Sequence, residues 1–408
     1  MRDSTLATAL AQAPALLIAC TSTRTGFGSA LSSVLGAWSP VSQPVPNDYR
    51  DRWRLRVLVA LTAVFLPLIA ANAATSNSQS CNGDTAMNDN SQVPFLEPRT
   101  QAFIDSLAAA GGPPLYTLSP DAARAVLVKV QDVPVEKPAA VIEDTTFPVG
   151  PTGSVRIRIV RPPEAKGPLP VLFHMHGGGW ILGDKNTHDR LTRELAVGAN
   201  AAVVFVDYDR SPEARYPTAI EQGYASILYV VEHARELNVD ASHLAIFGDS
   251  VGGDMSAALM LMVKERRGPR FALQVLFYPV TDANFETGSY NRFANGPWLT
   301  RKAMQWFWDA YLPDVEARKR PTAAPLNATI EQLRGLPDAL VAVDENDVLR
   351  DEGQAFARKL SQAGVRVTSV RYNGTIHDFA LLNPITETPA VRAAIAQATA
   401  ALRSALHR

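Results

Sequence analysis

The sequence predicts an α/β fold, with a mainly parallel central sheet flanked by helices and a helical cap. Two observations carry this prediction: short, almost continuous apolar runs recur along the chain, and helical stretches separate most of them. Strands that are buried on both faces have such continuous runs, and helical crossovers between successive strands make them parallel. With 408 residues, 47% of them hydrophobic, the chain has enough apolar material for a core of this kind.

The first regular elements are expected between residues 97 and 161. Arg99–Ala110 and Ser119–Val130 have helical periodicity, and Ser119 is an N-cap followed by proline at the first helical position. Ala140–Thr146 and Val155–Arg161 are then predicted to pair as strands around a turn rich in glycine and proline.

The core strands and their helices should follow in alternation. The expected strands are Val171–Met175, Ala202–Val206, Leu244–Phe247, Leu273–Phe277, Ala339–Val343 and Val365–Tyr372. The expected helices are His188–Val197, Pro217–Leu237, Gly252–Arg266, Asp351–Ala363 and Ala390–Leu406.

One interval interrupts this alternation, between the runs that end at Phe277 and begin at Ala339. Within it Thr300–Tyr311 and Ile330–Leu333 are predicted to be helical. The interval also carries a group of aromatic residues, Trp298, Trp306, Phe307, Trp308 and Tyr311. We expect residues 283–333 to join residues 97–131 as a cap over the carboxyl edge of the sheet; the alternative is that these aromatic residues only pack the core.

Charge and cysteine content exclude several classes of function. The chain has 39 basic and 40 acidic residues and a net charge of −1, which argues against a nucleic-acid partner. Its two cysteines, Cys20 and Cys81, are too few for a disulfide framework or a four-ligand zinc site. The sequence predicts no metal site and no cofactor.

Residues 1–92 are predicted to be an export region with a disordered linker, and residues 93–408 the folded domain. Arginines at positions 50, 52, 54 and 56 precede the apolar run Val57–Ile69, and Ala71-Asn72-Ala73 follows it. This is the pattern of a secretory signal peptide with its core at about residues 50–73. Leu17–Cys20 alternatively resembles a lipobox, with a lipid anchor at Cys20. We expect export to the periplasm or medium, with membrane contact only through the signal peptide or an anchor; a cytoplasmic location is the alternative.

A nucleophile is predicted at Ser250. Gly248-Asp249-Ser250-Val251-Gly252 lies between an apolar strand and a helix of small and apolar residues, the setting in which a G-x-S-x-G elbow works. The bend exposes the serine hydroxyl at a helix N-terminus, and a base must then take its proton.

A glycine-rich loop, His176-Gly177-Gly178-Gly179, directly follows the strand Val171–Met175. Its unshielded amides are suited to stabilising an oxyanion together with the amide of Val251, the residue after the serine. A phosphate cradle is the rival use, but the G-K-[ST] and G-x-G-x-x-G patterns are missing from the sequence.

The order nucleophile, acid, base predicts His377 as the base. Only His377 and His407 follow Ser250, and His407 is the penultimate residue. The acid should follow the strand Ala339–Val343. Asp351 and Glu352 are explained as first-turn carboxylates of a helix, which leaves Asp344, Glu345 and Asp347 open.

Together these motifs resemble the hormone-sensitive-lipase-like branch of the α/β hydrolases, which includes many bacterial carboxylesterases. The resemblance runs from about residue 97 to 408 through four ordered motifs: H-G-G-G at His176–Gly179, G-D-S-A-G-G at Gly248–Gly253, D-x-L-x-D-E-G at Asp347–Gly353 and G-x-x-H-x-F at Gly374–Phe379. It implies an α/β-hydrolase fold.

Carried over by position, the resemblance implies Ser250 as nucleophile, Asp347 as acid and His377 as base. It also implies oxyanion donors at the Gly178, Gly179 and Val251 amides, with His176 and Gly177 in the supporting part of the loop.

The chain departs from the family pattern at two places. Val251 stands where the family usually has alanine, and Asp207–Glu213 resembles D-Y-R-L-A-P-E with three substitutions. We interpret Asp207–Glu213 as structural, bracing the glycine-rich loop, and the role of Arg210 stays open.

The expected activity is serine carboxylic-ester hydrolysis through an acyl-enzyme, on short- to medium-chain esters, with a small-molecule ester as the partner. An amidase or lipase using the same triad is the alternative, and a non-catalytic receptor on this scaffold is a more distant one. The sequence does not fix the oligomeric state; a homodimer is compatible with it.

Overall fold

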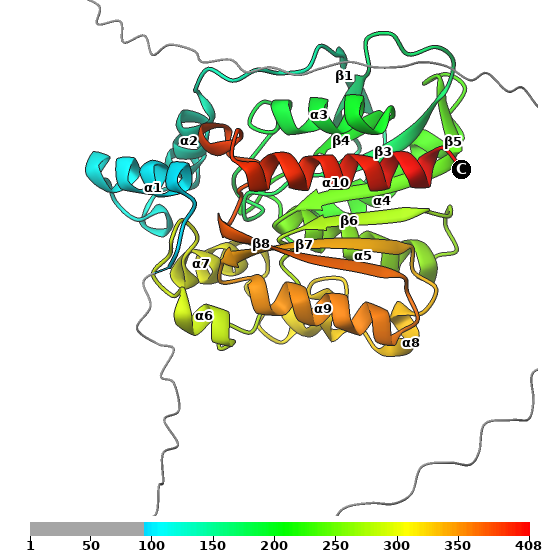
Figure 1. The fold of residues 1–408 in the computed structure, drawn as a ribbon. Coiled ribbons are helices and arrows are strands. Elements are labelled where there is room, and N and C mark those ends of the chain that lie inside the picture. Colours follow the sequence, from blue (N-terminus) through cyan, green and yellow to red (C-terminus); the bar gives the residue numbers. More distant parts are fainter. Residues whose placement is uncertain (1–93) are drawn as a thin grey trace, which may run out of the picture. The chain divides into compact units, whose positions relative to one another are not determined.

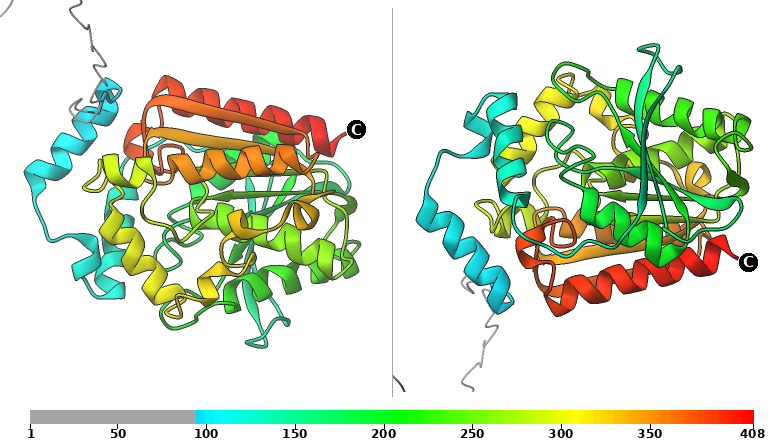
Figure 2. Two further views of the ribbon diagram at one scale, coloured as in Figure 1. Left: turned by 90° about the horizontal axis from the view of Figure 1, so that it is seen from below. Right: turned by 90° about the horizontal axis from the view of Figure 1, so that it is seen from above.

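The computed structural model describes residues 94–408 (Figures 1 and 2). The predicted signal peptide, the alternative lipobox and the linker up to residue 92 therefore lie outside the described residues. Within residues 94–408, no helix combines the length and the apolar character that crossing a membrane requires.

An eight-stranded sheet forms the centre of this part of the chain, in the order β1-β2-β4-β3-β5-β6-β7-β8. Its strands are β1 (Val141–Phe147), β2 (Val155–Arg161), β3 (Leu169–Met175), β4 (Ala202–Asp207), β5 (Val239–Asp249), β6 (Leu273–Phe277), β7 (Asp338–Asn346) and β8 (Val367–Ile376). Strand β2 is antiparallel to both β1 and β4, and all other neighbours are parallel. The mainly parallel sheet predicted from the apolar runs is confirmed, as is the pairing of the first two strands.

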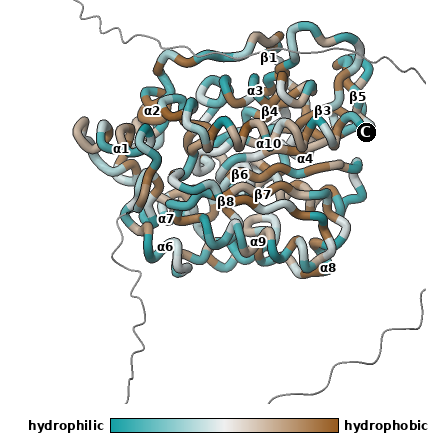
Figure 3. Tube along the Cα trace, viewed as in Figure 1, coloured by the Kyte–Doolittle hydropathy of each residue, from teal (hydrophilic) through white to brown (hydrophobic). Residues whose placement is uncertain are grey.

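Helices cover both faces of the sheet. α3 (Asp189–Ala199) and α10 (Pro389–Leu406) pack on one face, and α4 (Thr218–Glu232), α5 (Val251–Glu265) and α9 (Arg350–Gln362) on the other. In Figure 3 the outer helices α9 and α10 alternate between brown and teal along their length, as helices with one buried face do. Neighbouring strand residues such as Leu172 and Phe173 point to opposite faces of the sheet and pack in two separate hydrophobic clusters. Because both faces are buried, the strands are continuous apolar runs in the sequence.

The remaining helices lie outside these two layers: α1 (Pro98–Ala110), α2 (Pro120–Gln131), α6 (Gly288–Arg292), α7 (Arg301–Tyr311) and α8 (Ile330–Leu333). Figure 2 shows α1 and α2, in cyan, beside α6 and α7, in yellow, at one end of the sheet. α8 lies instead beside the C-terminal end of α5. There the ammonium group of Lys264 donates to the carbonyl oxygens of Glu331 and Gln332. Only part of the segment 283–333 thus lies beside α1 and α2.

Several element boundaries differ from the sequence expectation, and β8 for example ends at Ile376 rather than Tyr372. α4 ends at Glu232 rather than Leu237, and β5 begins at Val239, five positions before the predicted Leu244, because a register shift between Pro170 and Val171 lets Val239 pair with Leu169. β7 continues past Val343 to Asn346. The short helix α6 was not predicted, since five residues are too few to show a period.

Candidate active site

The strand β5 ends and the helix α5 begins around Ser250, which has φ of 55° and ψ of −123°. A positive φ is uncommon for a residue with a side chain, so the surroundings must hold this turn in place. The Ser250 amide donates to the carbonyl oxygen of Phe277 at 2.9 Å, and the Ser250 carbonyl accepts from the Val280 amide at 3.2 Å. A Cβ on Gly252 would overlap the carbonyl oxygen of Met175, so the helix approaches β3 this closely only because position 252 is glycine.

His377 follows β8 and joins the predicted nucleophile to an acid. Its Nε2 lies 2.9 Å from Ser250 Oγ, and its Nδ1 lies 2.9 Å from Asp347 Oδ2. A carboxylate only accepts hydrogen bonds, so Nδ1 carries a proton, and in the neutral imidazole Nε2 is the nitrogen that can accept the one from Ser250. All three side chains are buried.

Of the three acids that the sequence left open, the structure brings Asp347 to His377. Asp347 is the first residue after β7, and its Oδ1 accepts a hydrogen bond from the Leu349 amide at 3.1 Å. Glu345 instead accepts from the Gly374 amide at 2.7 Å. Asp344 lies inside β7, fully buried, and within the described residues neither of its oxygens has a hydrogen-bond partner.

The predicted oxyanion donors have no other acceptor. Within residues 94–408, the amides of Gly178, Gly179 and Val251 donate no hydrogen bond. The loop is held by other groups: the Leu182 amide donates to the Gly178 carbonyl at 2.7 Å, and the Tyr208 hydroxyl donates to the His176 carbonyl at 3.0 Å. These amides are therefore free to donate to another acceptor, and Gly178 and Gly179 line the same cavity as Ser250.

The segment Asp207–Glu213 contacts this loop, as the sequence interpretation proposed. The ring of Tyr208 stacks on that of His176 with centroids 4.1 Å apart, and Arg210 donates to the Gly183 carbonyl at 2.7 Å. Arg210 thus contacts the backbone four residues downstream of the glycine-rich loop.

Below the loop lies a buried group that the sequence motifs did not reveal. Asp249, next to the nucleophile, places its two oxygens 3.4 Å from His174 Nε2 and 3.3 Å from His188 Nε2. Burial alone would raise the pKa of Asp249, but the two histidines hold it below its usual range, and Asp249 in turn raises the pKa of His188 against the effect of burial. A Cβ on Gly177 would overlap the Asp249 carboxylate. The glycine-rich loop can therefore lie this close to Asp249 only because position 177 is glycine.

A second acid borders the predicted base. Asp378 Oδ1 lies 3.5 Å from His377 Nε2, and Asp378 Oδ2 accepts a hydrogen bond from Trp298 Nε1 at 2.9 Å. Burial alone lowers the pKa of His377, but the carboxylates of Asp347 and Asp378 outweigh it and raise this pKa to about 9. Asp378 stands inside the G-x-x-H-x-F motif, yet nothing in the sequence indicated its contact with Trp298.

A cavity of about 250 Å³ opens over Ser250 and His377. Its walls are mostly apolar and include Leu127 of α2, Met304 and Phe307 of α7, and Pro113 to Tyr116 between α1 and α2. Phe307 packs directly against Gly179, because a Cβ at position 179 would overlap its ring. The two segments that the sequence assigned to a cap thus both line the space in front of the serine.

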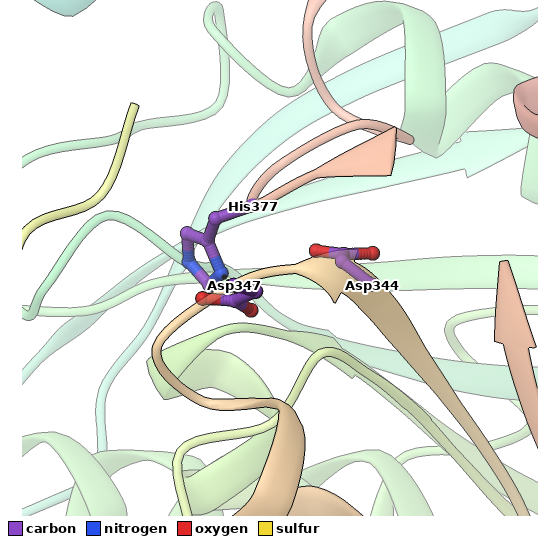
Figure 4. A group of neighbouring side chains, drawn as sticks. All are labelled: Asp344, Asp347 and His377. Atoms are coloured by element: carbon purple, nitrogen blue, oxygen red, sulfur yellow. Dashed lines mark hydrogen bonds and ion pairs between the residues drawn. The ribbon is translucent and has the colours of Figure 1, made fainter. Parts of the chain in front are cut away.

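Figure 4 shows the group in the described residues that offers metal-ligand atoms, Asp344 and Asp347 at the end of β7 and His377 at the end of β8. Their ligand atoms lie within 4.8 Å of one another. Asp347 and His377 already hold each other by a hydrogen bond, which an ion between them would replace. The arrangement therefore fits a histidine oriented by a carboxylate better than a metal centre.

Comparison with known proteins agrees with this geometry. A family described as alpha/beta hydrolase fold matches residues 172–381. The chain is 35% identical over 320 residues to carboxylesterase NlhH of Mycobacterium tuberculosis, covering 77% of this chain and 97% of that protein. Among solved structures, a thermostable esterase from Pseudomonas putida ECU1011 is 51% identical with a TM-score of 0.76, covering 78% of this chain and 99% of that one. A fungal esterase from Rhizomucor miehei is 40% identical with a TM-score of 0.72, covering 77% and 98%.

Proposed function

The chain belongs to the alpha/beta hydrolase fold family and is a carboxylesterase-type hydrolase, and from this premise we propose that Ser250, His377 and Asp347 carry out ester hydrolysis through an acyl-enzyme. The observation that carries the proposal is the unbroken chain of contacts from Asp347 Oδ2 to His377 Nδ1 and from His377 Nε2 to Ser250 Oγ, each 2.9 Å long.

The proposed first half-reaction forms the acyl-enzyme. Ser250 Oγ attacks the ester carbonyl while His377 Nε2 takes its proton, and Asp347 stabilises the imidazolium that results. The carbonyl oxygen becomes an oxyanion, which accepts hydrogen bonds from the Gly178, Gly179 and Val251 amides. His377 then gives the proton to the leaving alcohol as the carbon–oxygen bond breaks.

The second half-reaction repeats these steps with water as the nucleophile. His377 takes a proton from water, the hydroxide attacks the acyl carbon, and the proton returns to Ser250 as the carboxylic acid leaves. None of these steps requires a cofactor.

We propose neutral esters of short to medium acyl chain as the substrates. The cavity in front of Ser250 is about 250 Å³ in volume, and its walls are mostly apolar side chains of α2 and α7. Such a space favours binding of an alkyl chain of limited length.

The test is a series of p-nitrophenyl esters from acetate to octanoate, compared with an acyl anilide and an emulsified long-chain triglyceride. We expect the highest kcat/KM on the soluble esters, and Ser250→Ala should abolish the reaction. Preference for the anilide would indicate an amidase, activation at the oil interface a lipase, and turnover of no ester by folded protein would overturn the proposal.

We also propose that the protein is exported, on the strength of the arginine-flanked apolar run Val57–Ile69 and Ala71-Asn72-Ala73. Cell fractionation followed by N-terminal sequencing of the native protein tests this. A mature protein that begins at Met1 or Arg2 and stays in the cytoplasm would contradict it.

A further inference from the structure

Asp344 is a buried carboxyl group with no assigned task. It lies in β7, is fully buried, and within the described residues both of its oxygens lack a hydrogen-bond partner. An unpaired carboxyl group in such a place destabilises the fold unless it stays neutral. A residue of this kind needs an explanation beyond packing.

Its neighbours suggest one. Ligand atoms of Asp344, Asp347 and His377 lie within 4.8 Å of one another, and Figure 4 shows the three side chains together at the ends of β7 and β8. Two carboxyl groups this close and this deeply buried do not both ionise. Asp347 accepts hydrogen bonds from His377 and from the Leu349 amide, so the charge belongs on Asp347.

The state of Asp344 follows from this arrangement. Burial, with the charges of Asp347 and Asp378 added to it, raises the pKa of Asp344 well above its ordinary value. In the intact site Asp344 therefore keeps its proton. Loss of the Asp347 carboxylate would remove a neighbouring like charge and leave His377 Nδ1 without its present partner.

We propose that Asp344 is a reserve positioning residue, which takes over the orientation of His377 when Asp347 is lost. Asp344 then releases its proton to solvent, and its carboxylate accepts the hydrogen bond from His377 Nδ1–H. A carboxylate oxygen of Asp344 and one ring nitrogen of His377 lie at most 4.8 Å apart, and side-chain rotation has to bring the carboxylate to hydrogen-bond length from Nδ1. This inference rests on the proposed function, since it concerns the same histidine.

The experiment is a double-mutant cycle on the full chain, with kcat and KM measured on p-nitrophenyl butyrate. It compares the parent protein with Asp347→Ala, with Asp344→Asn and with the variant that carries both substitutions. Asp344→Asn lowers kcat by some factor in each background. This fold decrease should be at least about tenfold larger in the Asp347→Ala background than in the parent protein. KM should change by less than about threefold, because the contact acts through His377 and not on substrate.

A second comparison uses the space at position 347. Asparagine has nearly the same size as aspartate, so Asp347→Asn leaves no empty volume beside His377 Nδ1. Its amide group stays in contact with Nδ1, and Asp344 cannot reach the imidazole. Asp347→Ala should therefore retain at least about tenfold more kcat than Asp347→Asn, and this advantage should vanish once Asp344→Asn is added.

The matched control is Asp254→Asn. Asp254 is another fully buried acid without a hydrogen-bond partner in the described residues, but it lies on α5. Its replacement should lower kcat by the same factor in both backgrounds. Thermal melting checks that each variant folds, and Asp347→Ser takes the place of Asp347→Ala if the alanine variant does not.

Equal factors for Asp344→Asn in both backgrounds would overturn the inference. That outcome is distinct from failure of the proposed function, which would show as ester hydrolysis persisting in Ser250→Ala.

Discussion

Replacing Asp378 with asparagine should lower the pKa of His377. The Asp378 carboxylate lies 3.5 Å from His377 Nε2, and burial of His377 is outweighed by this charge and that of Asp347, which together raise its pKa to about 9. Asparagine keeps an oxygen that can accept the hydrogen bond from Trp298 Nε1. The substitution therefore removes a charge and preserves the contact.

The magnitude follows from the separation of the two groups. Opposite unit charges 3.5 Å apart attract by about 5 kcal/mol at an effective dielectric constant of about 20. At about 1.36 kcal/mol per pKa unit this corresponds to about three and a half units, and neighbouring charges usually shift a pKa by about one to three. We expect the change to lie in that range.

The assay is the pH dependence of kcat/KM on a p-nitrophenyl ester. A general base must be neutral, so kcat/KM falls as the pH drops through the pKa of His377 in the free enzyme. The midpoint of this acid limb should lie above the ordinary histidine value, toward about 9, and Asp378→Asn should move it down by about one to three pH units.

Trp298→Phe is the matched control, because it removes the indole donor and keeps the Asp378 charge. Its midpoint should move by less than that of Asp378→Asn. An acid limb that stays in place in Asp378→Asn, or that moves equally in Trp298→Phe, would refute the electrostatic reasoning.

Four further outcomes are expected. Ser250→Ala should lower kcat by about 10⁴-fold or more with an unchanged circular dichroism spectrum. Arg190→Met should destabilise the fold by about 3–5 kcal/mol in urea titrations, because the buried guanidinium contacts Glu194 at 2.6 Å and the carbonyl oxygens of Ala380 and Leu381 at 2.7 and 2.8 Å. Phe307→Ala should raise the octanoate-to-acetate ratio of kcat/KM, since this ring lines the cavity. The pKa of His377 is raised from 6.5 to about 9 on folding. Its contribution to the free energy of unfolding should therefore be complete below pH 6.5 and lost as the pH rises to about 9. Denaturation at a series of pH values measures this loss, which should be smaller in Asp378→Asn.

The parts of the site that sequence reasoning located are local ones. The serine elbow, the glycine-rich loop and His377 each occupy a short stretch directly after a predicted strand, so periodicity and motif together placed them at one edge of the sheet. The position of the acid after its strand left three candidates, and only the resemblance to the D-x-L-x-D-E-G motif implied Asp347. Position alone could not choose, because the choice depends on where β7 ends: the strand runs on through Asn346, which buries Asp344 and leaves Asp347 as the first residue beyond it.

The groups that sequence reasoning missed are assembled from distant elements. His174 comes from β3, His188 from the start of α3 and Asp249 from the end of β5. No spacing along the chain marks such a cluster, because only the register of the parallel strands brings β3 beside β5. The contact between Trp298 and Asp378 likewise joins two loops that are 80 positions apart.

The packing of Phe307 on Gly179 has a consequence for any attempt to adapt this enzyme. One ring both lines the cavity proposed to receive the acyl chain and packs against a peptide group expected to hold the oxyanion. A smaller side chain at position 307 should enlarge the cavity and also loosen the glycine-rich loop. A broader substrate range gained at this position should therefore come with slower turnover. Directed evolution toward bulky esters should succeed sooner at Leu127 or Met304, which line the same cavity from α2 and from the preceding turn of α7.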